Sequence, residues 1–185
     1  MNGFERNNQF LSLCGLNCGL CPMLIGKYCP GCGGGAGNQS CKIARCGIEH
    51  GCTEYCFRCA EYPCMKYENI DEYDSFITHR NQKTDLEKAR RIGIESYNEE
   101  QKEKAQILER LLVEYNDGRK KSMFCTAVNL LVLSDLREIL KKIDSTTGME
   151  DKEKSAYAAK TIKETAAERD IDLTLRKKTA SKKSK

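Results

Sequence analysis

Cysteines are the residues of this chain whose spacing most clearly indicates chemistry. Of the 12 cysteines among 185 residues, eleven lie between Cys14 and Cys64, and the last is Cys125. Three pairs have two intervening residues: Cys18/Cys21, Cys29/Cys32 and Cys56/Cys59. That spacing allows a tight turn to direct both sulfurs toward one tetrahedral ion. Three such pairs with further cysteines beside them predict a metal-binding segment.

We expect these thiols to be reduced. The N-terminal residues lack a basic segment followed by an unbroken apolar run, so they do not resemble a secretory signal. We therefore expect a cytoplasmic protein, in which metal ligation is favoured over disulfides. The chain also has no stretch of about 18 apolar residues, so we expect no membrane span.

The choice between zinc and iron is harder. Cys14, Cys18 and Cys21 have the spacing that holds the [4Fe–4S] cluster of radical enzymes, but those enzymes need a βα barrel, which this chain does not suggest. A four-cysteine electron-transfer cluster is a stronger alternative. The wider Cys41/Cys46 spacing and the distribution of the pairs favour zinc. We expect two zinc ions, with a [4Fe–4S] cluster as the alternative.

Bound metal changes the meaning of the formal charge of +4, which counts every thiol as neutral. Metal ligands are thiolates, so two loaded sites would leave the protein close to neutral. The composition is therefore weak support for nucleic-acid binding.

The cysteine-rich segment, residues 1–67, is called the head below. It contains all three prolines and 11 of the 14 glycines, but few large apolar side chains. So small a segment rarely builds a sufficient hydrophobic core. A structural zinc ion contributes on the order of 10 kcal/mol of folding free energy. We therefore expect the head to need its metal in order to fold.

The ordered cysteine series resembles a known family. The segments CGLNCGLCP (14–22), CPGC (29–32), CKIARC (41–46) and CFRCAEYPC (56–64) resemble the cysteine-rich family numbered 3795 among domains of unknown function. The segments RRIGIESYNEEQKEK and YNDGRKKSMFCTAVNLLVLSDL look like parts of its longer members. The resemblance implies a bacterial or archaeal cytoplasmic metal-binding protein without an established activity. The cysteines that match the family pattern, and that we expect to bind metal, are Cys14, Cys18, Cys21, Cys29, Cys32, Cys41, Cys46, Cys56, Cys59 and Cys64.

Other candidate ligands are weaker. Cys52 is additional to the family pattern. His50 lies between cysteines, but a surface loop position explains it more simply. His79 is expected at a helix end, and Cys125 is expected to be a buried small apolar residue rather than a nucleophile. We assign no catalytic residue and no binding site for an organic cofactor.

The expected fold class is mainly α. The head, a small metal-stabilised module with zinc-knuckle-like loops, precedes a helical body (residues 68–172) and a basic, disordered tail (residues 173–185). Apolar residues at helical spacing predict five or six helices in the body. Asn98 and Ser134 are expected to cap two of them. The expected helices cover residues 68–78, 84–97, 98–115, 122–132, 134–143 and 149–169.

These features favour a structural or interaction module that contacts a partner protein or a second copy of itself. An iron–sulfur redox or sensor protein is the alternative. A metal-dependent enzyme is a lesser one, because it requires an open ligand position. The tail allows a nucleic-acid contact, but solubility explains its charge as well.

Overall fold

The structure, a computed structural model, describes residues 3–35, 41–52, 54–146 and 148–178. Within these ranges the chain is helical and has no strand, which confirms the mainly α fold class. No described helix is both long and apolar enough to cross a membrane. The elements are η1 (Cys18–Leu20), α1 (Pro22–Ile25), α2 (Lys42–Glu49), η2 (Cys56–Arg58), η3 (Met65–Tyr67), α3 (Gln82–Ile92), α4 (Ile94–Glu114), α5 (Lys121–Leu130), α6 (Leu133–Asp144) and α7 (Asp151–Glu168).

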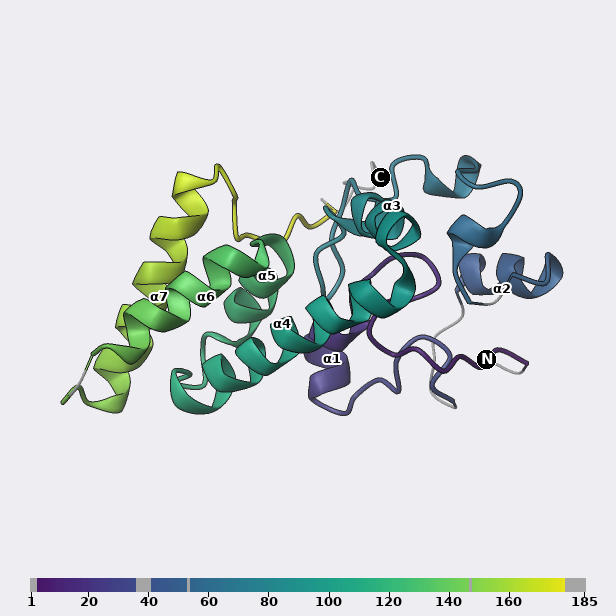
Figure 1. Cartoon of the computed structure of the whole chain (residues 1–185). Coiled ribbons are helices and arrows are strands. Elements are labelled where there is room, and N and C mark those ends of the chain that lie inside the picture. Colours follow the sequence, from purple (N-terminus) through teal and green to yellow (C-terminus); the bar gives the residue numbers. More distant parts are fainter. Residues whose placement is uncertain (1–2, 36–40, 53, 147, 179–185) are drawn as a thin grey trace, which may run out of the picture.

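Helices α4 to α7 enclose the larger hydrophobic core. Leu108 and Leu111 of α4 lie on one face at helical spacing and are buried against Phe124 of α5. Ile139 of α6 and Ile162 of α7 belong to the same core. Figure 1 shows α6 and α7 at one end of the molecule, the cysteine-rich loops and α2 at the other, and α4 running between them. Five α-helices follow residue 68 in the described part of the chain, within the expected five or six.

The helix expected over residues 68–78 is absent, because side-chain hydrogen bonds hold a different conformation. Residues 68–81 form turns after η3. The Asp74 carboxylate accepts the backbone N–H of His79 at 2.7 Å and the hydroxyl of Thr78 at 3.3 Å. Such bonds from a short acidic side chain compete with helical backbone bonds.

The boundary between α3 and α4 also differs from the prediction. Gly93 has a φ of +87°, which ends α3 and begins α4. Only glycine adopts this left-handed conformation without strain. Asn98 therefore lies inside α4 rather than at its N-cap, and Ser134 lies in the first turn of α6.

The head shares its hydrophobic core with the body. Leu11 is fully buried and packs in one cluster with Leu86 of α3 and Tyr97 of α4. Leu20 is fully buried in the larger core of α4 to α7. The boundary expected at residue 67 therefore does not separate two independent cores.

Residues 170–178 run from the end of α7 back toward the loop of residues 68–81. The Asp74 N–H donates to the Arg176 carbonyl at 2.7 Å, and the Arg176 N–H donates to the Asp74 carboxylate at 2.8 Å. Arg80 donates to the carbonyls of Asp172 and Thr174. Residues 173–178, which we expected to be disordered, are thus held by specific bonds. The remainder of the predicted tail, residues 179–185, lies outside the described residues.

Candidate metal centres

The cysteines of the head gather around two cavities. All 12 cysteines fall within the described residues and are free thiols. Ten of the eleven head cysteines line one cavity or the other, five in each. The first cysteine cavity is lined by Cys14, Cys18, Cys29, Cys32 and Cys41, and the second by Cys46, Cys52, Cys56, Cys59 and Cys64.

The first cavity is built from the N-terminal loop, η1, the turn after Cys29 and the N-cap of α2. The turn depends on its glycines. Gly33 has a φ of +80°, and a Cβ there would lie 2.7 Å from Cγ of Arg6. A side chain at this position would therefore be strained and would also push Cys32 away from Arg6.

Hydrogen-bond donors surround the sulfurs of the first cavity. Ser12 Oγ lies 3.2 Å from Cys14 Sγ, and the Gly31 N–H donates to Cys29 Sγ at 3.4 Å. The Leu16 N–H donates to Ser12 Oγ at 2.8 Å and so orients this hydroxyl beside Cys14. Donors of this kind favour the thiolate form, which is the form that binds metal.

Burial opposes that ionisation when no cation is bound. It raises the pKa of the Cys14 thiol to about 11 and raises the pKa values of Cys18 and Cys32. The other thiols of the cavity add to the effect, because neighbouring thiolates would repel each other. The cavity therefore offers hydrogen-bond donors to thiolates, but its buried thiols need a bound cation in order to ionise.

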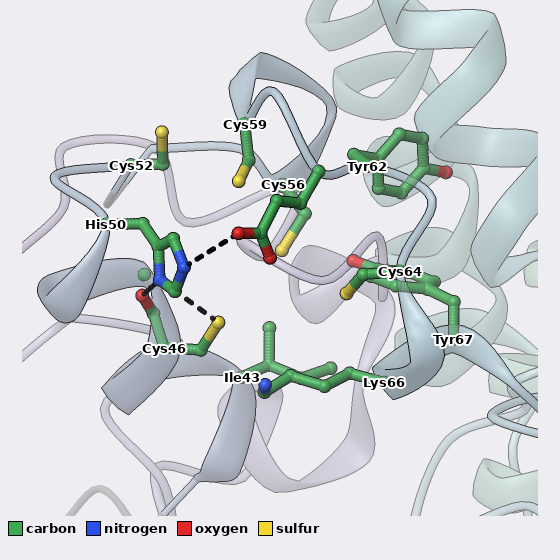
Figure 2. A pocket seen from close by; sticks show the side chains of 12 residues that line it. Ile43, Cys46, His50, Cys52, Cys56, Cys59, Tyr62, Cys64, Lys66 and Tyr67 are labelled. Carbon is green, nitrogen blue, oxygen red and sulfur yellow. Dashed lines mark hydrogen bonds and ion pairs between the residues drawn. The ribbon is translucent and has the colours of Figure 1, made fainter.

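The second cavity lies between α2, η2 and the loop that follows it. Figure 2 shows the sulfurs of Cys46, Cys56, Cys59 and Cys64 around one space, with Cys52 at its edge. Burial raises the pKa of the Cys56 thiol to about 12, although the nearby Tyr67 hydroxyl acts in the opposite direction. Cys52, which we did not include among the expected ligands, thus also lines this cavity.

His50 also lines the second cavity. Its Nδ1 lies 2.9 Å from the Cys46 carbonyl oxygen and 3.6 Å from Cys46 Sγ, and its Nε2 lies 3.4 Å from Glu61 Oε1. Both ring nitrogens thus have an oxygen acceptor nearby, the Cys46 carbonyl for Nδ1 and the Glu61 carboxylate for Nε2. Its position one helical turn after Cys46 is the sequence signal that links it to the site.

The two cavities are neighbours. Cys41 at the N-cap of α2 lines the first, and Cys46 of the same helix lines the second. The buried Tyr67 side chain lines the second cavity, while its hydroxyl donates to the Cys14 carbonyl of the first at 3.3 Å. Helix α2 and Tyr67 therefore connect the two cavities.

Cys21 and Cys125 line neither cavity. Cys21 is the N-cap of α1. We expected it to be a ligand, but its side chain is not part of the lining of either cavity. Cys125 is only 3% exposed within the larger core, which confirms the expected buried apolar role. Burial raises the pKa of Cys125 to about 12.

The thiols face their cavities without yet converging on a point. Among the described residues, no three His, Cys, Asp or Glu side chains stand in a group that could hold an ion. Binding would therefore require side chains to rotate inward. Comparisons with protein-family models, with curated proteins and with solved structures gave no match for this chain.

Proposed function

We propose that the head is a metal-binding module that takes two zinc ions, one in each cysteine cavity. The observation that carries the proposal is the division of ten free thiols into two sets of five. Cysteines far apart in the sequence, such as Cys14 and Cys41, meet in one cavity. Reduced thiols of this kind suit a reducing compartment such as the cytoplasm.

The donor set fits zinc. Thiolate sulfur is a preferred zinc ligand, and a structural site needs four. Each cavity offers one thiol more than that number. Cys14, Cys18, Cys29, Cys32 and Cys41 would supply the ligands of the first ion, and Cys46, Cys56, Cys59 and Cys64, with Cys52 or His50 nearby, those of the second. Bound zinc would supply positive charge that keeps the buried sulfurs ionised and cross-links their loops.

The proposed role of the loaded module is structural, with an interaction surface beside it. Tyr28 is 77% exposed and Met65 is 82% exposed, and each lies next to a cysteine in the sequence. Large apolar side chains exposed on cross-linked loops suit contact with another protein or a second copy of this chain. We do not assign a catalytic residue.

Metal analysis of the full chain, purified without oxygen, tests the proposal. We expect a colourless protein with one zinc ion for each cavity and with only Cys21 and the surplus thiols free to react, since Cys125 is buried. A brown protein that contains iron would show that the head holds an iron–sulfur cluster instead of zinc. A folded protein without metal, in which all thiols of both cavities react freely, would overturn the proposal.

A further inference from the structure

Arg6 is a buried cation beside the first cysteine cavity. Its side chain is only 5% exposed. Its backbone N–H donates to the Gly33 carbonyl at 3.1 Å, and Nη1 donates to the Cys32 carbonyl at 3.4 Å. The Cys32–Gly33 turn therefore packs directly on Arg6.

The guanidinium group has many hydrogen-bond partners but no anionic one among the described residues. Nε and Nη2 donate to the Glu54 carbonyl at 3.0 and 2.6 Å, and Nη2 also donates to the Leu11 carbonyl at 3.0 Å. The group lies 5.1 Å from the centre of the Tyr55 ring. No described carboxylate forms an ion pair with it. A buried charge without a counter-charge is costly, even when its hydrogen bonds are satisfied.

A metal site in the first cavity would supply the negative charge that Arg6 lacks. Cys32 lines that cavity, and its carbonyl accepts a hydrogen bond from Arg6 Nη1 at 3.4 Å. Four thiolates around a divalent ion leave two negative charges in excess, whether the metal is zinc or a [4Fe–4S] cluster replaces it. An arginine beside such a site offsets part of this excess.

We propose that Arg6 is the counter-ion of the first metal site, a positioning residue whose charge holds the ion in that cavity. The inference rests on the proposed metal-binding function. In this role the positive charge of Arg6 is what matters. In a purely structural role, Arg6 would only join the Cys32 turn to the Glu54 loop through hydrogen bonds. A lysine keeps the charge but loses the planar set of bonds, so it separates the two roles.

The test compares Arg6→Gln with Arg6→Lys in the full, zinc-loaded chain, with release of each ion followed against increasing chelator. Arg58→Gln is the matched control, because Arg58 lies 5.5 Å from the same Tyr55 ring but is exposed. We expect R6Q to lose one of its two ions at about 10- to 100-fold lower chelator strength, with the other ion unaffected. R6K and R58Q should release both ions as the wild type does.

Two results would overturn the inference while the proposed function stands. One is that R6Q releases both ions at the same chelator concentrations as the wild type. The other is that R6K releases one ion as early as R6Q does. Circular dichroism shows whether each variant folds. If R6Q does not fold, R6K decides alone, since retention of both ions supports the counter-ion and loss of one contradicts it. A wild-type chain that binds no metal would instead overturn the proposed function, and this inference with it.

Discussion

Single buried polar residues join the head to the body. Asn17 lies between Cys14 and Cys18 in the sequence, and its amide donates to the Asp85 carboxylate of α3 at 2.8 Å. Tyr97 of α4 donates to the Asn17 carbonyl oxygen at 2.8 Å. Burial raises the pKa of Asp85 to about 6, although the charge of Lys104 lowers it. The residue between two candidate ligands is thus held by an ionisable group of the body.

Asp85 should make stability depend on pH. A carboxyl group whose pKa is raised on folding binds more protons in the folded state, so stability falls as pH rises from about 4 to about 6. Asp85→Asn removes the titration and keeps the size. We expect the free energy of unfolding of D85N, relative to the wild type, to rise by roughly 3 kcal/mol across this range. Chemical denaturation of both proteins at each pH measures it, and because metal release affects both, a constant difference would contradict the burial argument.

Cysteine substitutions separate ligands from core residues. We expect Cys18→Ser and Cys59→Ser each to release one ion to a chelator more readily than the wild type, from the first and the second cavity respectively, because the substitution leaves that cavity with no surplus thiol. Cys125→Ser is the control: it should keep both ions and lower the free energy of unfolding by about 1 to 2 kcal/mol, because it buries a hydroxyl group in the larger core. Metal content and thermal unfolding measure both effects. Loss of an ion in C125S would show that metal content reports folding rather than ligation.

At the scale of elements, the junction of α3 and α4 positions the body against the head. Leu86 and Ala89 of α3 and Tyr97 of α4 pack on Leu11 in one cluster. The two helices meet at Gly93, whose left-handed backbone sets the angle between them. This junction, rather than a cap at Asn98, decides which face of α4 meets the cysteine loops.

Gly93→Ala tests that junction. The added Cβ would have space, since the nearest atom lies 3.8 Å away, so backbone strain at a φ of +87° is the main cost. We expect G93A to lower the free energy of unfolding by about 1 to 2 kcal/mol. Ser96→Ala, an exposed position in the first turn of α4, should change it little. Equal effects of both substitutions in urea unfolding would rule out strain as the cause.

At the scale of the whole molecule, the two ends differ in what holds them together. Apolar side chains of α4 to α7 pack in the larger core, whereas the smallest cluster, in the head, contains Phe4, Leu13 and Ala44. Leu11 and Leu20 of the head are buried in the clusters shared with the body. Loss of metal should therefore loosen the cysteine loops of the head but leave Leu11 and Leu20 packed against the body.

Treatment with a chelator tests this division. We expect protease cleavage to appear in residues 29–35 and 50–64, where cysteines outnumber buried apolar side chains. Helices α3 to α7 should stay protected, because their apolar core does not involve metal. Mass spectrometry of the fragments locates the cuts. Protection of the whole head in chelator would show that its fold does not need metal.

The sequence by itself determined the helical class of the fold, because apolar residues recur at helical spacing through the body. It also placed the candidate metal ligands in the first 67 residues, because eleven cysteines stand there. It did not predict the turns around Asp74, where a carboxylate that binds Arg176 from the far end of the chain overrides local helix formation. Nor did it predict the left-handed junction at Gly93.

Only the tertiary structure decided which cysteines stand together. Spacing paired Cys18 with Cys21, but folding places Cys18 in the first cavity and leaves Cys21 out, while Cys52 joins the second. The same holds for Arg6, whose neighbours Cys32 and Glu54 are remote in sequence. The physical reason is that short spacings constrain a turn, whereas a tetrahedral site is completed by contacts between turns, which depend on how the whole chain packs.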